Sequence, residues 1–439
     1  MVTGPTRHIS LAVLLALSAG QALAGSTLAA MPLGQDLSLA GASHGHSIQP
    51  LGNNPAAPAA ADTERMRFGL GAVAAGYELG SLDNISDRID ELEEELDREF
   101  ASMNEAEEAK ERIDRFLRDL GRDGYVKLAA GGQPPMMPLD VGLPRIGGRF
   151  SLGLSAVGAM RVSFLDAPIE VVSTGSGEYE LQSRTSGYIK GAGGTVLSLG
   201  YSADALQHRD GTLVVGGRLN RYDMELGKAV AAIEDGDEDE DDFDDALEDD
   251  FERNRRDGTA TGLDLGLLWK TPTYQLGATL RNVNEPQLRY PRIGRNCDAL
   301  DGASATNCHT AASFGDRISL AETHTLERQL QLEGALFSAN RRWSLAGTWD
   351  LNASRDITGD ENQWHGINAA YAGRGWWVPG ARLGYRSNRG GSELSLITGG
   401  LTFFRLLNLD VAMATDSVDD DGSSLPRAAM ASLSLEFRY

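Results

Sequence analysis

The chain has 439 residues, two cysteines, 52 glycines and a formal net charge of −23 at pH 7. This charge argues against a nucleic-acid partner, because proteins that bind nucleic acid neutralise phosphates with lysine and arginine. After the amino-terminal segment, no apolar stretch reaches the length of about 18 residues that a membrane helix needs, so membrane-spanning helices are also excluded.

Residues 1–24 have the pattern of a secretory signal peptide. Arg7 supplies a positive start, residues 9–17 are mostly apolar, and Ala-Leu-Ala at 22–24 is a small-x-small cleavage site before Gly25. A buried N-terminal helix is the alternative, but the apolar run is too short to span a bilayer and is followed at once by the cleavage pattern. We predict that the chain is exported, either as a soluble periplasmic protein or as a β-barrel.

An early strand over residues 66–80 is followed by a change of period at residues 81–121. There the apolar residues recur every three or four positions and acidic residues fill the other faces, which predicts an amphipathic helix. One straight helix of this length would measure about 60 Å, twice a bilayer core, so we expect a two-helix hairpin. Three interpretations stay open: a plug, a docking element for a partner helix, and a solvated hairpin packed on a barrel rim. The candidate docking residues are Leu82, Ile85, Ile89, Leu92, Leu96 and Phe116.

The remainder of the chain, residues 122–439, contains an acidic loop at 234–257. Between Glu234 and Glu252 it carries fourteen acidic residues and no basic one. Like charges at this density repel and stay solvated, which predicts a disordered surface loop. A divalent-cation site is the alternative, but the spacing of a calcium-binding loop is absent.

A second long loop, residues 286–324, contains both cysteines. Cys297 and Cys308 lie eleven positions apart, and an even pair in an exported chain predicts a disulfide. Closing this loop would stabilise the fold by about 3 kcal/mol through the unfolded state. A metal pair with the neighbouring His309 is the alternative, but no fourth ligand is in sight.

From Thr259 onward, apolar residues alternate with polar ones in segments about ten residues long, the length of a membrane-barrel strand. Leu263, Leu265 and Leu267, for example, alternate with Asp264. A tight turn, a long loop with both cysteines and another tight turn follow in order, as expected for periplasmic turns and external loops. Charged residues recur on the polar faces, which the core of a soluble sandwich would not tolerate.

The chain ends in ASLSLEFRY, which alternates up to its last residue, Tyr439, with no polar tail to protect a sheet edge. A closed barrel has no edge, so we predict that this strand pairs with an early one. The fold class is therefore an all-β membrane protein, a closed antiparallel outer-membrane β-barrel of about 12–14 strands with an inserted helical hairpin. Tryptophans that lie near strand ends, where rings favour the membrane interface, are Trp343, Trp364, Trp376 and Trp377.

The segment before the first strand, residues 25–65, contains PLGQDLSLAGASHGHSIQPLGNNPAAPA. Its small residues and its Asn-Pro-Ala sequence resemble the amino-terminal region of FadL-type outer-membrane proteins. The Gly-Gly-x-Gly run of that group appears here only as Leu-Ala-Gly-Ala around Gly41. The resemblance implies that residues 25–65 form an inward plug, with Gly41, Asn54, Pro55 and Ala56 as its candidate residues, in a barrel that passes hydrophobic molecules.

The order of elements is similar to the conjugal-transfer TraF-like branch of the same group. The elements are the strand MRFGLGAVAAGYELG, an acidic helical segment, the strand pair LDLGLLWKTPTYQLGATLRNVNEP and the terminal LSLEFRY. This resemblance covers nearly the whole mature chain. The name of the branch points to conjugation or secretion, although no residue here indicates DNA transfer.

We predict a protein that is not an enzyme and has no cofactor or metal, because its seven histidines lie in no nucleophile or metalloprotease motif. A metal shared by His44 and His46 is an alternative that lacks further ligands. The leading function is to bind or pass small hydrophobic molecules across the outer membrane of a Gram-negative cell. The path would be lined by lumen residues, whose alternative role is a ladder of ion pairs: Arg281, Arg382, Arg386, Asp350 and Asp410.

The alternative function is that of an envelope-assembly component of a conjugation or secretion apparatus. In that case the hairpin at residues 81–121 would dock a partner protein. The expected partners are therefore outer-membrane lipid, a hydrophobic small molecule and an envelope protein, with no nucleic acid.

Overall fold

The computed structural model describes residues 32–43, 47–48, 53–61, 65–96, 98–145, 147–175, 177–232, 249–373, 375–420 and 422–438. The predicted signal peptide, His44, His46, Tyr439 and the acidic stretch at 233–248 lie outside the described residues.

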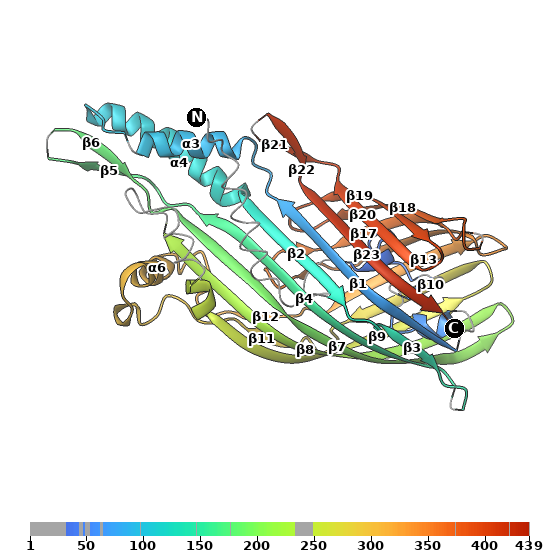
Figure 1. Ribbon diagram of the computed structural model, residues 1–439. Coiled ribbons are helices and arrows are strands. Elements are labelled where there is room, and N and C mark those ends of the chain that lie inside the picture. Colours follow the sequence, from blue (N-terminus) through green and yellow to red (C-terminus); the bar gives the residue numbers. More distant parts are fainter. Residues whose placement is uncertain are drawn as a thin grey trace.

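Fourteen strand positions form one closed antiparallel barrel (Figure 1). In order around the wall, the strands are β1 (Met66–Leu79), β2 (Tyr125–Gln133), β4 (Arg149–Leu165), β7 (Ser186–His208), β8 (Gly211–Ala232), β9 (Arg255–Lys270), β10 (Tyr274–Arg281), β13 (Gln329–Phe337), β14 (Trp343–Asp350), β17 (Trp364–Tyr371), β18 (Gly380–Asn388), β19 (Ser395–Phe403), β20 (Leu407–Ala414) and β23 (Ala428–Arg438). The short β3 (Leu139–Gly142) continues the position of β2, because β1 and β4 pair with both. The predicted closed barrel is confirmed, with a strand number at the upper end of the expected range.

The last strand closes the barrel, as predicted from its sequence. β23 runs antiparallel to β1, with Phe68 opposite Phe437 and Glu78 opposite Ala428. The rings of Phe68 and Phe437 lie 5.3 Å apart across this seam. Closure satisfies the backbone groups of both terminal strands, which matters because unpaired backbone groups are too costly in hydrocarbon.

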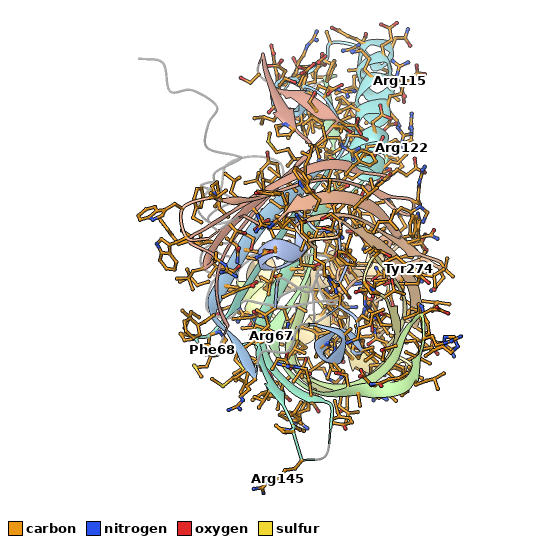
Figure 2. The ribbon with its side chains drawn as sticks, turned by 90° about the vertical axis from the view of Figure 1, so that its right-hand side faces the viewer. Arg67, Phe68, Arg115, Arg122, Arg145 and Tyr274 are labelled. Atoms are coloured by element: carbon orange, nitrogen blue, oxygen red, sulfur yellow. A yellow bond between two sulfur atoms is a disulfide. The ribbon has the colours of Figure 1, made fainter. Side chains whose placement is uncertain are left out.

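The two faces of the wall differ in polarity as the alternation predicts. On β9, Leu265 and Leu267 are 45% and 51% exposed on the outer surface, whereas Asp264 is 3% exposed inside. On β1, Arg67 is buried and its neighbour Phe68 points away from the lumen (Figure 2). The outer surface is thus an apolar band around the barrel, which is the architecture of outer-membrane proteins.

The two ends of the barrel differ in the length of their connections. One end carries the start of β1, the end of β23 and tight turns such as Thr271–Thr273 (Figure 1). The other end carries the long insertions, and outer-membrane barrels place such loops outside the cell. The elements of this external end are α3 (Ile85–Leu96), α4 (Met103–Asp123), β5 (Glu170–Ser173), β6 (Tyr179–Gln182), β11 (Gln287–Arg289), η3 (Cys297–Ala299), α6 (Gly302–Ser313), β12 (Thr323–Thr325), β15 (Ser354–Arg355), β16 (Glu361–Asn362), β21 (Ser417–Asp420) and β22 (Ser423–Pro426).

The helical hairpin α3–α4 stands on the external rim rather than in the lumen (Figure 1). Ser102 begins α4, because its hydroxyl accepts a hydrogen bond from the backbone N–H of Glu105. Among the described residues, no helix is long and apolar enough to cross a membrane. The candidate docking residues face inward, where they join a small core with Phe100, Ile169 and Leu181: Leu82, Ile85, Ile89, Leu92, Leu96 and Phe116.

The predicted disulfide is confirmed at the same external end. Cys297 in η3 is bonded to Cys308 in α6. Beyond α6, Phe314 and Ile318 pack against Leu165 of β4. The disulfide loop is therefore a folded cap on the rim and is not an extended loop.

Candidate functional site

The N-terminal segment lies inside the barrel. Its backbone packs closely against the wall at positions where the wall has glycines. It contains η1 (Gly34–Asp36) and α2 (Ala57–Ala60). A Cβ atom on Gly216 would lie 2.1 Å from the carbonyl oxygen of Pro55, and one on Gly266 would lie 2.1 Å from Oδ1 of Asn54. Any larger residue at these two wall positions would push the segment away. The sequence signal for this packing is glycine on the inward face of a strand.

The Asn54-Pro55-Ala56 sequence is tied to the wall by hydrogen bonds. Nδ2 of Asn54 donates to Oε1 of Glu333 at 2.7 Å and to the carbonyl of Leu267 at 3.1 Å. Its Oδ1 accepts from the backbone N–H of Ala56 at 2.9 Å. Glu333 also accepts from the backbone N–H of Ser43 at 2.7 Å. One buried carboxylate thus holds two parts of the segment.

Gly41 has a different role from the wall glycines. Its φ of +80° lies in the left-handed region, whereas an added Cβ would find only ordinary contacts at 3.9 Å with Gln331 and Thr348. The backbone conformation, rather than lack of space, therefore favours glycine here. The carbonyl of Gly41 accepts from Nδ2 of Asn53 at 3.3 Å, which fixes this turn.

Further hydrogen bonds connect the segment to several strands of the barrel. Donor–acceptor distances range from 2.6 to 2.7 Å for the pairs Gly34–Ser432, Gln35–Asn408, Ala40–Thr348, Leu39–Asn368 and Ser47–Glu436. These partners lie on the part of the wall between β14 and β23. The backbone N–H of Ala59 donates to the hydroxyl of Ser202 on β7 at 3.0 Å, and Asn54 donates to Leu267 on β9, so the segment is also anchored on other strands and is held across the lumen. A solute that crosses the barrel must therefore pass beside it.

Arg382 and Asp410 form an ion pair in the lumen. Nη2 of Arg382 lies 3.0 Å from Oδ1 of Asp410. Nε of Arg382 also donates to the hydroxyl of Ser38 at 2.8 Å, and its Nη1 donates to Thr402 at 2.6 Å. This arrangement matches the ladder of ion pairs and leaves neither group facing open space.

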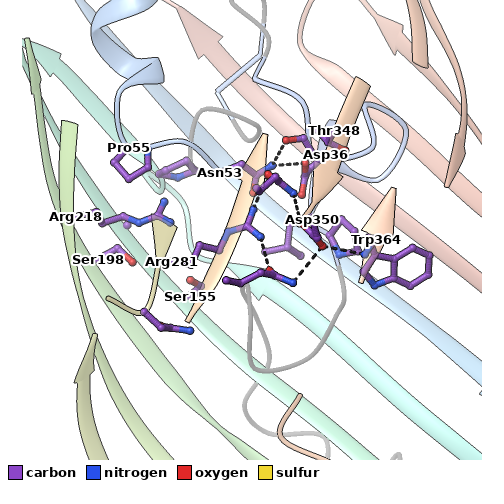
Figure 3. A pocket seen from close by; sticks show the side chains of 18 of the residues that line it. Asp36, Asn53, Pro55, Ser155, Ser198, Arg218, Arg281, Thr348, Asp350 and Trp364 are labelled. Carbon is purple, nitrogen blue, oxygen red and sulfur yellow. Dashed lines mark hydrogen bonds between the residues drawn. The ribbon is translucent and has the colours of Figure 1, made fainter. Parts of the chain in front are cut away.

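Arg281 and Asp350 are joined through two glutamines (Figure 3). Nη1 and Nη2 of Arg281 donate to Gln329 and Gln331, each at 3.1 Å. The amide nitrogens of the same glutamines donate to Asp350 at 3.2 and 2.8 Å. Sequence reasoning missed these glutamines, although the alternation in QLQL at 329–332 places both on the inward face.

Arg386 is the third lumen arginine, and its surroundings differ from those of the other two. Its guanidinium lies 4.9 Å from the ring centre of Trp364, which therefore lies against the lumen rather than at the membrane interface expected for it. Arg386 donates no hydrogen bond to any described residue, and its Nε is buried without a partner. Asp36 and Asp350 are its acidic neighbours. Burial raises the pKa of Asp36 in η1, while Arg386 and a hydrogen bond from Asn53 act to lower it.

A cavity of about 220 Å³ lies between the N-terminal segment and the wall. Its polar lining includes Asp36, Arg281, Asp350 and Arg386, and Trp364 lies beside them (Figure 3). The apolar part of the lining includes Leu33, Ile48, Pro55, Leu139, Leu152 and Leu326. The cavity thus combines an apolar surface with many polar and charged groups, which can orient a small molecule.

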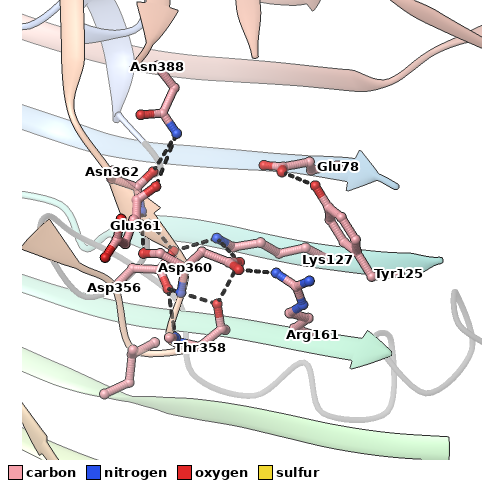
Figure 4. Close-up of polar contacts among 12 residues, drawn as sticks. Glu78, Tyr125, Lys127, Arg161, Asp356, Thr358, Asp360, Glu361, Asn362 and Asn388 are labelled. Carbon is pink, nitrogen blue, oxygen red and sulfur yellow. Dashed lines mark hydrogen bonds and ion pairs between the residues drawn. The ribbon is translucent and has the colours of Figure 1, made fainter. Parts of the chain in front are cut away.

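The loop at residues 351–363, here called the roof loop, closes the cavity on the external side. Asp356 accepts from Lys127 of β2, and Asp360 accepts from Lys127 at 2.9 Å and from Arg161 of β4 (Figure 4). The hydroxyl of Tyr290 donates to the carbonyl of Ile357 at 2.6 Å. The loop thus leaves the wall after β14 and is bound by strands on another side of the barrel.

In the part of the chain that is described, no group of three or more histidine, cysteine or acidic side chains is arranged to hold an ion. The carboxylates of the roof loop instead bind Lys127 and Arg161.

Comparison with known proteins gives a family and distant structural neighbours. The family model described as "F plasmid transfer operon, TraF, protein" matches residues 52–350. A FadL homologue of Pseudomonas aeruginosa is 10% identical, with 95% of this chain and 99% of that chain covered and a TM-score of 0.41. The P. putida toluene transporter TodX is 13% identical, with 88% and 92% covered and a TM-score of 0.42. No curated protein matches the sequence significantly.

Proposed function

This chain belongs to the family of the F plasmid transfer operon TraF proteins, and we propose that it binds small, largely apolar molecules in its lumen and passes them across the outer membrane. The single observation that carries the proposal is the cavity between the N-terminal segment and the wall. Its apolar lining removes such a molecule from water, and the hydrophobic effect makes this favourable. Its volume of about 220 Å³ is below the range of drug-sized sites, so it suits a small ligand.

An interruption of the wall next to the cavity supports a route for the ligand. The ladder between β1 and β2 ends at Gln133, and pairing resumes with β3 at Leu139. Pro134, Pro135 and Pro138 lie in between and have no N–H to donate, so they break the ladder, although the carbonyl of Pro138 still accepts from the N–H of Gly69 at 2.9 Å. Gln133, Pro138 and Leu139 also line the cavity. The ligand would pass between the lumen and the outer surface at this interruption, because the N-terminal segment occupies the direct path along the barrel axis.

A variant that fills the cavity tests the proposal. Ser155 on β4 lines the cavity, and its neighbour Leu154 is exposed on the outer surface. We expect small molecules to co-purify with the wild type and with Leu154→Trp, but not with Ser155→Trp, in native mass spectrometry of protein extracted gently from outer membranes. Heat-dependent gel mobility would verify that each variant folds, and Ser198→Phe would replace a variant that does not. Equal ligand in the filled variants would contradict the proposal.

Docking of an envelope partner is the second candidate function, and the position of the hairpin favours it. α3–α4 stands on the external rim, and Arg115 and Arg122 of α4 extend into solvent (Figure 2). Because the apolar residues are packed inside the hairpin, a partner would meet its charged surface. Deleting residues 82–120 should then abolish capture of the partner and leave ligand in the lumen. Capture that survives the deletion would contradict this role.

A further inference from the structure

We infer that the lumen cavity binds a small organic acid, whose carboxylate is held by Arg386. The inference rests on the proposed function and specifies its ligand class. It follows from the donors and acceptors in the cavity, from the way in which Arg386 is positioned, and from the contrast with Arg382 on the same strand.

The carboxylates of the cavity already accept hydrogen bonds. Asp350 accepts from Gln329, from Gln331 and from the backbone N–H of Trp364 at 2.9 Å. Asp36 accepts from Nδ2 of Asn53. These acidic groups therefore have partners within the protein and do not require a cation from a ligand.

Arg386 has unused donors. A guanidinium carries five N–H groups, and none of those of Arg386 donates to another described residue. Burying a polar group without a partner is unfavourable, so the protein gains if a ligand supplies an acceptor. Arg281 adds positive charge nearby without competing, since its own donors are bound to Gln329 and Gln331.

Trp364 positions the guanidinium for such a ligand. The guanidinium lies over the indole at 4.9 Å, and the indole N–H donates to Oδ1 of Asn362 at 3.2 Å, which fixes the ring. Stacking leaves the edge of the guanidinium available, and that edge binds a carboxylate through two parallel hydrogen bonds. The site is thus partly ordered before a ligand binds, which lowers the entropic cost of binding.

The other charges select the ligand. Asp36 and Asp350 lie near Arg386 and would repel an anion with two charges, so a single negative charge is favoured. The cavity is large enough for an aromatic ring or a short chain but too small for a long acyl chain. Its apolar surface includes Leu33, Ile48 and Leu326. The chemical class is therefore a small monocarboxylate with an apolar body.

Benzoate and benzyl alcohol, which share a ring and differ in charge, test the inference by calorimetric titration of the full-length protein. We expect benzoate to bind the wild type more tightly than benzyl alcohol. Arg386→Gln should weaken benzoate by at least about tenfold, as expected for a charge-assisted hydrogen bond, and leave benzyl alcohol unchanged. Arg389→Gln removes the same charge at an exposed position nearby and should leave both affinities unchanged.

The outcomes separate this inference from the proposed function. If benzyl alcohol binds the wild type as tightly as benzoate, or if Arg386→Gln binds benzoate like the wild type, the anion site is wrong and the lumen site stands. If neither compound binds any variant, the proposed function fails and the inference fails with it. If Arg386→Gln does not fold, Arg386→Lys keeps the charge but loses the paired hydrogen bonds, and it should still weaken benzoate.

Discussion

Arg382 and Arg386 lie on the same strand and both face the lumen, but their surroundings are opposite. Arg382 is surrounded by acceptors from Asp410, Ser38 and Thr402. The guanidinium of Arg386 lies over the ring of Trp364, and Arg386 lines the cavity. Residue type and strand position therefore do not decide the role of an arginine in this lumen. The guanidinium of Arg382 has acceptors within the protein and stabilises the fold, whereas that of Arg386 has no acceptor among the described residues and can bind a ligand.

The largest expected effect comes from breaking the ion pair between Arg382 and Asp410. Asp410→Ala leaves the guanidinium of Arg382 buried without an acidic partner, which should lower the free energy of unfolding by about 4 kcal/mol. Arg386→Gln removes no hydrogen bond to a described residue and should change the free energy of unfolding little. Replacing Arg382 and Asp410 together by leucine should recover most of the loss. Urea denaturation followed by gel mobility measures all three, and equal midpoints for Asp410→Ala and Arg386→Gln would contradict the comparison.

The roof loop extends the comparison to the external side of the cavity. Lys127→Ala removes the shared partner of Asp356 and Asp360 and should destabilise the protein by about 2 kcal/mol, because Arg161 remains to bind Asp360. The loop should also open, so that a cysteine introduced at Thr358 reacts faster with a maleimide that cannot cross membranes. The control is Lys110→Ala, which removes an ion pair with Asp114 in α4 and should change neither property. Unchanged labelling in Lys127→Ala would show that other contacts hold the loop.

Packing of the N-terminal segment on wall glycines gives a smaller effect. Gly266→Ala would place a methyl group against Asn54 and should lower stability by about 1.5 kcal/mol and expose the segment to protease. Gly399→Ala on β19 is the matched control, because a Cβ there meets no heavy atom within 4 Å. Equal protease sensitivity of the two variants would argue against close packing at Gly266.

The smallest effect concerns His324, a buried residue at the end of the disulfide loop. Its Nε2 has no partner among the described residues. Burial lowers the pKa of His324, and Lys190 lowers it further, whereas Glu322, Asp356 and Glu327 act in the other direction. Below the ordinary histidine pKa of about 6.5, His324 binds a proton in the unfolded chain but stays neutral in the folded chain. The free energy of unfolding therefore falls as the pH falls below about 6.5.

We therefore expect a modest decrease of the unfolding midpoint between pH 7.5 and 5.5 in the wild type. His324→Gln should reduce this decrease, whereas the exposed His309→Gln should keep it. Thermal unfolding at both pH values measures the difference. An identical pH dependence in His324→Gln would assign it to other groups.

The alternating pattern of the sequence was enough to predict the barrel wall. Leu265 and Leu267 face outward and Asp264 inward because side chains of a strand alternate with a period of two, and this period needs no knowledge of distant residues. The disulfide followed from an even pair of cysteines in an exported chain. The hairpin followed from a change to a helical period.

Only the tertiary structure decided which charges have partners. Ser38 and Asp410, or Lys127 and Asp360, are separated by hundreds of positions and meet because the barrel closes around a segment that enters its lumen. The register of each strand then decides that Arg382 faces an acid while Arg386 faces Trp364. Local sequence fixes the side of the wall on which a residue lies, and the contacts inside depend on the closed shape that all strands form together.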